Sequence, residues 1–535
     1  MKRLIWGKMP KVEIYDTTLR DGTQAENFNL QLEDKLKIAQ KLDEIGVDYI
    51  EGGWPGSNPK DIHFFSRIKN YHFKKAQIVA FGSTHHPQKT PQTDPNLKAL
   101  IEAKTEVVTI FGKSWDLHVK DALRISLEQN LEIIFNSLAY LRAHVKKLFY
   151  DAEHFFDGFK DNPQYALATI KKALDAGADC IIFCDTNGGT LPFELENIIS
   201  QVNSKLPNIS WGIHAHNDAA TAVANSLVAV HLGATQVQGT INGVGERCGN
   251  ADLCSIIPAL KLKMGIDCVT DEQLAKLTAV SRYITELVNI AHPPYLPYVG
   301  RSAFAHKGGV HVSAVKRNPQ TYEHIPPQKV GNIRRILISD LSGKSTILSK
   351  AKEWGINLES EDPEVQKILQ ELKDLENQGF QFDVAEESFK LRIYKAKGEL
   401  KNHYFRLLTY RVHDYNTLDG RPIAEAEVWV EVKGKERHAL SLGMGPVNAL
   451  DRALRKALEE FYPKLKEMSL VDYRVRVLPG TSGTEAKVRV LIESRDKECV
   501  WRTVGVSHDI LEASLQALLD SIVYRLFLDE QRKKC

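Results

Sequence analysis

The sequence predicts an α/β protein whose first half is a closed (β/α)8 barrel of the TIM type. Eight short segments rich in β-branched and aromatic residues alternate with helix-like segments over about the first 265 of the 535 residues, which matches the size of such a barrel. An open, doubly wound sheet is the alternative, but no GxGxxG motif follows any of the segments. The expected strands are 12–18, 49–53, 77–82, 107–113, 147–153, 180–186, 210–216 and 236–241.

The chain is expected to contain three regions: the barrel (1–265), mainly helical linker subdomains (266–395) and a C-terminal α+β domain (396–535). The last region contains a repeat, because AEVWVEVKG begins at 426 and AKVRVLIES at 486. Gly445 and Gly505 each precede a helical pattern at the same offset of 60 residues. Two strand-strand-helix copies predict a pseudo-twofold domain, for which dimerisation and ligand sensing are both open interpretations.

Composition excludes several classes of protein. The net charge of +2 gives no electrostatic case for binding nucleic acid, and no apolar run reaches the roughly 18 residues of a membrane-spanning helix. The seven cysteines are scattered and form no CxxC pair, which argues against a disulfide framework or a thiolate zinc site. We therefore expect a reduced, cytoplasmic protein without a membrane or nucleic-acid partner.

A divalent metal site is predicted at the end of the seventh strand. His214 and His216 are two residues apart, so both imidazoles point to one face of a strand. Asp21, which follows the first strand, is the best anionic candidate for a third ligand, because the first and seventh strands of a closed barrel lie near each other. One carboxylate with two imidazoles suits a Lewis-acid site for oxygen substrates. Ordinary core or loop histidines are the alternative.

Other polar residues follow neighbouring strands. Arg20 stands beside Asp21 and is suited to stabilising developing oxygen charge, although a helix-entry loop explains the same stretch. Thr186 can donate a hydrogen bond to a carboxylate or belong to a plain turn. Glu153 can be a base, or a strand-end carboxylate paired with a neighbouring lysine. Asn250 lies in a Gly-rich loop after the eighth strand and can complete a metal shell.

Together these motifs resemble the family of α-isopropylmalate, homocitrate and citramalate synthases. The resemblance covers nearly the whole chain: DTTLRDGTQ (16–24), GIHAHND (212–218), GVGERCGNA (243–251), FAHKGGVHVSAV (304–315) and the tandem C-terminal domain. It implies a metal-dependent barrel, a homodimer, and a C-terminal domain that binds the end product of the pathway. The implied cofactor is a divalent ion (Mg, Mn or Zn).

The resemblance also implies roles for single residues. Asp21, His214 and His216 match the metal ligands, with Asn250 beside them, and Arg20 matches the arginine that faces the reacting oxygens. Thr186 is implied to bind the keto-acid carboxylate, with Gln24 assisting. Glu153 is implied to be a catalytic carboxylate. His311, joined by Tyr322, is implied to reach the active site of the partner subunit. After Glu153 the segment YDAEHFFDG departs from the family pattern, so the neighbours of this glutamate are not assigned.

Two segments, YIEGGWPGSNPKD (49–61) and GFQFDVAEESF (379–389), look most like the citramalate synthase branch. The implied reaction condenses acetyl-CoA with pyruvate and hydrolyses the thioester, with isoleucine as the expected effector. The alternative within the family uses 2-oxoisovalerate, as 2-isopropylmalate synthases do, with leucine as effector. A lyase running the reverse cleavage and a non-catalytic metal-binding protein are the other classes. The tandem domain argues against the lyase, and the intact set of polar residues argues against the non-catalytic protein.

Overall fold

The chain forms two compact units in a computed structural model that describes residues 11–339, 342–359, 361–400, 404–417, 420–478 and 485–534. The first unit runs to Phe304 and includes Ile325–Arg334; the second contains Ala305–His324 and the chain from Arg335 onward. The range 266–395 is therefore divided between the two units. The physical reason is that its helices bury their apolar faces in different cores: Leu277 and Ile284 in the core of the first unit, Ile368 and Phe389 in that of the second.

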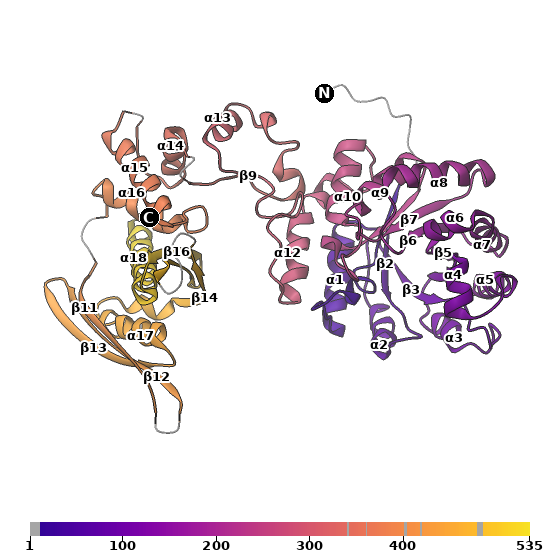
Figure 1. Ribbon diagram of the computed structural model, residues 1–535, viewed down its shortest axis with the longest axis horizontal. Coiled ribbons are helices and arrows are strands. Elements are labelled where there is room, and N and C mark those ends of the chain that lie inside the picture. The colour runs from indigo at the N-terminus through magenta and orange to yellow at the C-terminus, as the bar shows by residue number, and fades with distance from the viewer. Residues whose placement is uncertain are drawn as a thin grey trace. The chain divides into compact units, whose positions relative to one another are not determined.

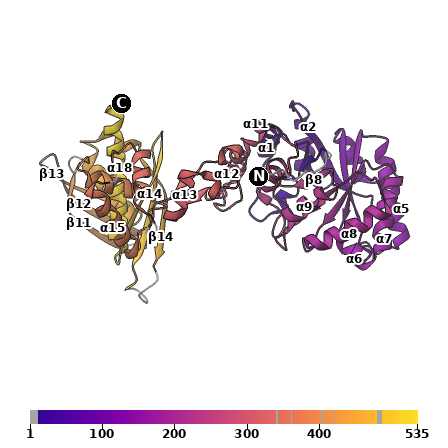
Figure 2. The same ribbon diagram turned by 90° about the horizontal axis from the view of Figure 1, so that it is seen from above.

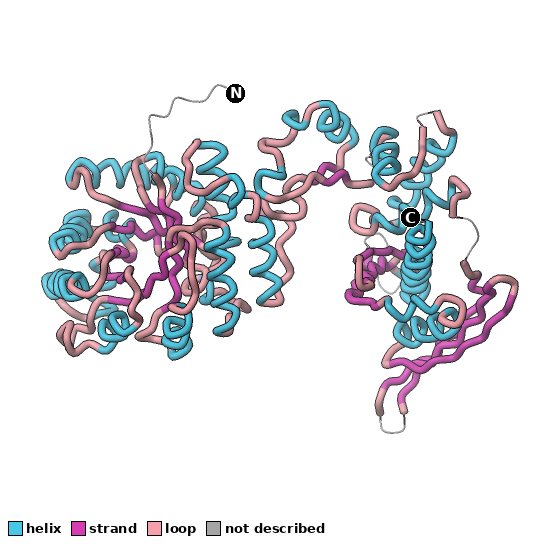
Figure 3. Tube along the Cα trace, turned by 180° about the vertical axis from the view of Figure 1, so that it is seen from behind, coloured by secondary structure: helices cyan, strands magenta, loops and turns pink. Residues whose placement is uncertain are grey.

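The first unit is a closed barrel of eight parallel strands in sequential order, with β8 pairing back onto β1 (Figures 1 and 3). The predicted fold class is confirmed, and the predicted strands agree with the observed ones to within two residues at each end. The strands are β1 (Glu13–Asp16), β2 (Tyr49–Gly53), β3 (Gln77–Ser83), β4 (Val107–Lys113), β5 (Lys147–Glu153), β6 (Cys180–Asp185), β7 (Trp211–Ala215) and β8 (Gln236–Gly239).

Helices surround the strands, and several begin where the sequence supplies a cap. Asn58 and Asp94 accept hydrogen bonds from the first backbone N–H groups of their helices, and each precedes a proline at the first helical position. The helices are α1 (Leu32–Glu44), α2 (Pro59–Ile68), α3 (Pro95–Glu102), α4 (Asp116–His118), α5 (Leu127–Arg142), α6 (Phe155–Asp161), α7 (Pro163–Asp175), α8 (Pro192–Lys205), α9 (Ala222–His231), α10 (Leu253–Ala259), α11 (Asp271–Leu274) and α12 (Leu277–Leu287). Over the part of the chain that the structure describes, no helix is both long and apolar enough to span a membrane.

The inside of the barrel changes in character along its axis. A small cluster of buried side chains, including Tyr15, Tyr49 and Phe149, fills the middle of the barrel. Closer to the carboxyl ends of the strands the buried residues are polar or charged, among them Glu51 and Gln238, both with 0% exposure. Buried charged and amide groups are tolerated only where they are paired, so this end of the barrel must hold a connected polar site.

The second unit contains two copies of a β-β-β-α element. In the first, β11 (Arg406–Asn416), β12 (Pro422–Val432) and β13 (Lys435–Gly443) form an antiparallel sheet covered by α17 (Pro446–Leu458). In the second, β14 (Ser469–Val477), β15 (Val488–Arg495) and β16 (Val500–Ser507) are covered by α18 (Ile510–Lys534). Helices α17 and α18 contact each other, and Figure 2 shows α18 between the β11–β13 strands and β14. The unit also contains β9 (Ala305–His306), α13 (Gly309–Arg317), β10 (Arg335–Ile336), α14 (Lys344–Glu353), α15 (Pro363–Gln378) and α16 (Glu386–Ala396).

Two details of the predicted repeat are wrong. Each copy has three strands, not two, because β11 and β14 match each other at an offset of 63 residues (YRV at 410–412 and at 473–475) and so fall outside the constant offset of 60. The constant offset of 60 also fails at the helices: Gly445 precedes α17 at 446, but Gly505 lies inside β16 and α18 begins at 510. The second helix starts later because the turn between β15 and β16 (496–499) is longer than the turn between β12 and β13 (433–434). Asp509 then caps α18, its carboxylate accepting a hydrogen bond from the N–H of Leu511 at 2.7 Å.

Candidate active site

Three predicted metal ligands meet at the carboxyl end of the barrel. The Asp21 Oδ2 atom lies 3.3 Å from His214 Nε2 and 3.9 Å from His216 Nε2, and the two Nε2 atoms are 3.4 Å apart. All three residues are buried, and they form the one such group of potential ligands found among the described residues. The two-residue spacing at the end of β7, which His216 directly follows, therefore brings both imidazoles to Asp21, as the sequence predicted.

Loop geometry completes the site. Gly249 has φ +89°, and a Cβ there would lie 2.0 Å from the Gly243 carbonyl oxygen, so a glycine is required. The turn allows the N–H of Asn250 to donate to the Gly243 carbonyl at 2.9 Å and places Asn250 in a β-bridge with His216. Asn250 is thus beside the ligands, where the sequence predicted it.

The charges of the site are strongly coupled. Burial alone would raise the pKa of the Asp21 carboxyl, but the Arg20 guanidinium and the two imidazoles hold that pKa well below its usual range. Burial lowers the pKa of His216 to about 4, with the neighbouring His214 adding to the effect. Burial opposes the charged form of His214 as well, but the hydrogen bond and charge of Asp21 outweigh it and raise its pKa. The site therefore offers an ionised carboxylate and, at His216, a neutral imidazole.

This donor set fits a divalent cation. Asp21 Oδ1, Asn250 Oδ1 and His216 Nδ1 are buried atoms for which the described residues supply no hydrogen-bond partner. Unpaired buried acceptors are costly, and a cation relieves that cost for oxygen atoms such as those of Asp21 and Asn250. A mixed imidazole and carboxylate set suits Zn, Mn or related ions, so the identity of the metal is not fixed by the ligands.

Arg20 is held rigidly beside the ligands. Its Nε donates to Glu51 Oε1 at 2.6 Å, its Nη1 lies 3.3 Å from Asp21 Oδ2, and its guanidinium carbon stands 3.8 Å above the centre of the Phe81 ring. The hydroxyl of Tyr15 donates to the other Glu51 oxygen at 2.6 Å. The sequence did not single out Glu51. It could have been found from its place two residues after Tyr49 on a buried strand, because this spacing puts both side chains on the inner face.

A second polar chain supports His214. Its Nδ1 lies 3.0 Å from Gln238 Oε1, and Gln238 Nε2 donates to Asp151 Oδ1 at 3.3 Å. Burial raises the pKa of Asp151 to about 7, although the charges of His214 and Arg20 oppose the rise. Neither Gln238 nor Asp151 was predicted, because a single glutamine or aspartate on a strand carries no motif.

The remaining barrel residues lie around this centre. Glu153, at the end of β5, forms an ion pair with Lys113, its register neighbour at the end of β4. This is the pairing that the sequence left open, and a catalytic role for Glu153 stays a prediction. Thr186 directly follows β6, and its hydroxyl oxygen accepts a hydrogen bond from the His154 N–H at 2.9 Å. The hydroxyl proton of Thr186 thus remains available for a substrate carboxylate. Gln24 is exposed in the short turn after Asp21.

His311 and Tyr322 belong to the second unit. Both are exposed, and their rings lie 4.2 Å apart between centroids, so the structure brings this predicted pair together. Their role at the active site of a partner subunit stays a prediction.

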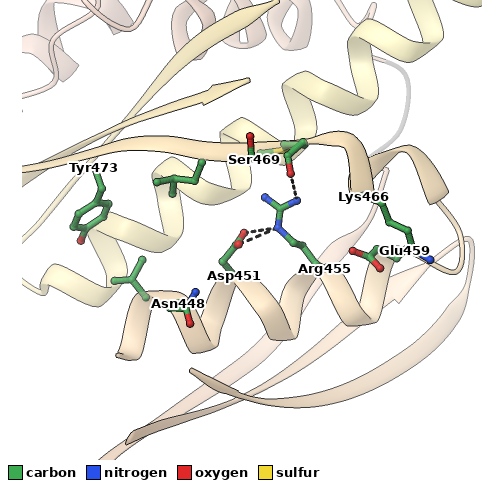
Figure 4. Close-up of a pocket in the computed structure, with 10 residues that line it drawn as sticks. Asn448, Asp451, Arg455, Glu459, Lys466, Ser469 and Tyr473 are labelled. Carbon is green, nitrogen blue, oxygen red and sulfur yellow. Dashed lines mark hydrogen bonds and ion pairs between the residues drawn. The ribbon is translucent and has the colours of Figure 1, made fainter. Parts of the chain in front are cut away.

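The second unit also contains an open cavity of about 610 Å³ between α17 and the start of β14 (Figure 4). Inside it, Arg455 is fixed by the Asp451 carboxylate at 2.9 Å and by the carbonyl oxygens of Leu465 and Met468, both at 2.9 Å. The cavity is lined by Val447, Asn448, Asp451, Arg455, Glu459, Lys466, Met468, Ser469, Leu470 and Tyr473. Val447 and Asn448 belong to the first turn of α17.

Comparison with known proteins agrees with this architecture. The HMGL-like family model matches residues 11–284, a homocitrate synthase post-HMGL domain-like model matches 298–379, and the LeuA allosteric (dimerisation) domain matches 383–526. An (R)-citramalate synthase from Geobacter sulfurreducens is 58% identical over 98% of this chain and 99% of the relative. One from Aquifex aeolicus is 54% identical over 97% of this chain and 99% of the relative.

The chain belongs to the (R)-citramalate synthase family. It is an enzyme of the condensing acyltransferase type. A 2-isopropylmalate synthase from Methanocaldococcus jannaschii is more distant, at 31% identity over 96% of this chain and 94% of the relative. The barrel, the helical segment and the tandem domain are therefore shared across both branches, and the higher identity lies on the citramalate side.

Proposed function

We propose that this enzyme condenses acetyl-CoA with pyruvate and hydrolyses the thioester, releasing (R)-citramalate and CoA for isoleucine biosynthesis. The observation that carries the proposal is the cluster of Asp21, His214 and His216 with Arg20 at the mouth of the barrel, in a chain 58% identical to an (R)-citramalate synthase. A keto acid needs a cation for its carbonyl and carboxylate oxygens, and this cluster supplies the ligands for one.

Asp21, His214 and His216 would hold the divalent ion, with Asn250 beside them. When bound, such an ion polarises the keto carbonyl of pyruvate and orients its carboxylate. Arg20, fixed by Glu51, presents a permanent cation to the oxygen on which negative charge develops as the new bond forms. The Thr186 hydroxyl donates to the substrate carboxylate, and the exposed Gln24 can assist.

The acetyl group must lose a proton from its methyl carbon before it attacks the keto carbon of pyruvate. Glu153 and His311 are the two candidate bases, and both stay in the proposal. The ion pair with Lys113 fixes the position of the Glu153 carboxylate at the end of β5. Water then attacks the thioester, CoA leaves as the thiol, and the carboxylate product makes the overall reaction favourable.

Bulky aromatic residues beside Arg20 favour pyruvate over 2-oxoisovalerate. Phe81 lies under the guanidinium and stacks on Phe111, with ring centroids 5.5 Å apart, and Trp54 packs its edge against both rings. Trp54 is in turn held by Asn96, which accepts a hydrogen bond from its indole N–H at 2.6 Å. We propose that these fixed rings line the keto-acid pocket, where they leave room for the methyl group of pyruvate but less for an isopropyl group.

We further propose that the tandem domain dimerises and binds isoleucine. Support comes from the LeuA allosteric (dimerisation) match and from the cavity against α17, whose lining carries both cationic and anionic groups for the two charges of an amino acid. The catalytic residues lie elsewhere, so inhibition must act through a shift between conformational states. The six described cysteines are free, which is consistent with a cytoplasmic enzyme.

A thiol-release assay tests the proposal. The enzyme is supplied with acetyl-CoA and pyruvate, 2-oxobutyrate or 2-oxoisovalerate in turn, and the product is identified by chiral chromatography. We expect CoA release with pyruvate and (R)-citramalate as the product. Faster turnover of 2-oxoisovalerate would instead make the protein a 2-isopropylmalate synthase, and no CoA release with any keto acid would refute the condensation itself.

A further inference from the structure

One of the two imidazoles at the candidate metal site is oriented by a buried amide, and the other is not. His214, on β7, is within 3.0 Å of Gln238 Oε1 through its Nδ1, and Gln238, on β8, has 0% exposure. By contrast, the Nδ1 of His216 is buried without a hydrogen-bond partner among the described residues. The protein therefore fixes one imidazole through its own side chains and leaves the other less constrained.

The orientation of the Gln238 amide is set by groups behind it. Its Nε2 donates to Asp151 Oδ1 on β5 at 3.3 Å and to Gln236 Oε1 at 3.4 Å. Gln236 presents a carbonyl oxygen at this point, and Asp151 presents an acceptor oxygen when it is ionised. Turning the Gln238 amide around would point its carbonyl oxygen at these two acceptors, so the orientation with Oε1 toward His214 satisfies the most groups.

This orientation decides which tautomer His214 adopts. An acceptor 3.0 Å from Nδ1 holds an imidazole proton on that nitrogen, so the neutral form of His214, which is the form that binds a metal ion, has its lone pair on Nε2. The Nε2 atom is the one that lies 3.3 Å from Asp21 Oδ2 and 3.4 Å from His216 Nε2. The free lone pair thus points to the place where the three ligands meet.

We propose that Gln238 and Asp151 are positioning residues for the metal ligand His214, with Asp151 acting through Gln238. The inference rests on the metal site of the proposed function and adds two residues to it. Neither residue touches the reacting atoms in this scheme. Their contribution is to metal affinity, because an imidazole held in the correct tautomer and direction loses less freedom on binding the ion.

The test is a titration of metal-free, full-length enzyme with Mn²⁺, in which free Mn²⁺ is measured by electron paramagnetic resonance without substrates. Gln238→Leu removes the acceptor for His214 at similar volume and should weaken Mn²⁺ binding by roughly tenfold to a hundredfold. Asp151→Leu should weaken it less, because the hydrogen bond from Gln238 to Gln236 remains. In the Gln238→Leu background, Asp151→Leu should have no further effect, since its partner is gone.

Two more variants separate orientation from simple loss of packing. The double substitution Gln238→Glu with Asp151→Asn exchanges the carboxylate and the amide, so the side chain at 238 still accepts from His214 and the side chain at 151 donates to it. Because Gln236 must turn its own amide to donate to the new carboxylate, we expect this pair to bind Mn²⁺ clearly more tightly than Gln238→Leu. Asn225→Leu is the matched control: it removes another fully buried amide, on α9, where Asn225 donates to the Thr190 carbonyl at 2.7 Å. It should lower the melting temperature without changing Mn²⁺ affinity.

The outcomes are distinguishable. If wild-type enzyme binds no Mn²⁺ that Asp21→Ala abolishes, the metal site of the proposed function is wrong. If that site exists but Gln238→Leu binds Mn²⁺ as tightly as wild type, the positioning role is refuted. A full Asp151→Leu effect in the Gln238→Leu background, or an exchanged pair as weak as Gln238→Leu, also refutes it. A Gln238→Leu protein that does not fold leaves the exchanged pair and Asp151→Leu to decide the matter.

Discussion

Replacing Glu51 with glutamine tests how Arg20 is held at the reacting centre. Glu51 is completely buried and accepts hydrogen bonds of 2.6 Å from both Arg20 and Tyr15. Glutamine keeps the shape of the side chain but can accept through one oxygen only. Tyr15 can adapt, because its hydroxyl also lies 2.9 Å from Thr109 Oγ1 and is free to donate there. The guanidinium then loses the carboxylate that fixes it on the side away from Asp21.

The expected effect follows from the loss of a charged hydrogen bond. Such bonds contribute about 1.5–3 kcal/mol, and each 1.36 kcal/mol corresponds to roughly a tenfold change in rate. The side chain of Arg20 is 14% exposed, so solvent does little to screen the loss. We expect kcat/KM for pyruvate to fall by roughly tenfold to a hundredfold, because Arg20 shifts toward Asp21 and no longer faces the developing oxygen charge.

Steady-state kinetics by thiol release measure the effect, and Glu13→Gln provides a matched control. Glu13 accepts a hydrogen bond from Tyr49 at 3.0 Å and lies at the opposite, amino-terminal end of the barrel. Glu13→Gln therefore makes the same Glu-to-Gln change at a barrel strand without touching Arg20. Glu51→Gln with wild-type kcat/KM and wild-type melting temperature would show that the guanidinium does not depend on this carboxylate.

Four further predictions follow from the same geometry. Arg20→Lys keeps the charge but loses the planar fork, so kcat should fall by at least about tenfold, ~1.4 kcal/mol, while Mn²⁺ affinity is little changed. His214→Ala should abolish both metal content, by elemental analysis, and activity, while circular dichroism shows an intact fold. Pyruvate should exceed 2-oxoisovalerate by roughly tenfold or more in kcat/KM, since each methylene-sized difference is worth about 1–3 kcal/mol. Finally, burial raises the pKa of Asp16 from 3.8 to about 7, so the folded state binds a proton at Asp16 more tightly than the unfolded state does. The folding free energy gained from this proton is fully present below pH 3.8 and is lost as the pH rises from 3.8 through 7. Asp16→Asn should therefore gain unfolding free energy relative to wild type between pH 4 and pH 8, as measured by urea denaturation; a constant difference would contradict the burial argument.

The sequence was sufficient to predict the barrel and the clustering of Asp21, His214 and His216 because both are encoded locally. Strand ends and strand alternation place His214 and His216 on one face, and the closed topology brings Asp21 to them. The partners of Arg20 and His214 could not be predicted in the same way. Glu51 and Gln238 meet these residues across neighbouring strands, and the contact depends on a register that no local pattern reveals.

The C-terminal unit shows a different limit. Its repeat was visible in the sequence, but β11 and β14 were missed because they match each other at an offset of 63 residues and not at the constant offset of 60. The constant offset also led to a wrong equivalence, since the turn between β15 and β16 (496–499) is longer than the turn between β12 and β13 (433–434). Gly445 is the residue before α17, whereas Gly505 packs inside β16 against Ala513.

The central claim is that Asp21, His214 and His216 bind a divalent ion and that pyruvate binds directly beside this ion. Proton relaxation of the pyruvate methyl group in the presence of Mn²⁺-loaded enzyme tests this most directly, because the paramagnetic effect falls steeply with distance from the ion. We expect strong relaxation enhancement with wild-type enzyme and its loss in Asp21→Ala. Catalytically active Mn²⁺ enzyme that binds pyruvate without enhancing its relaxation would contradict the account.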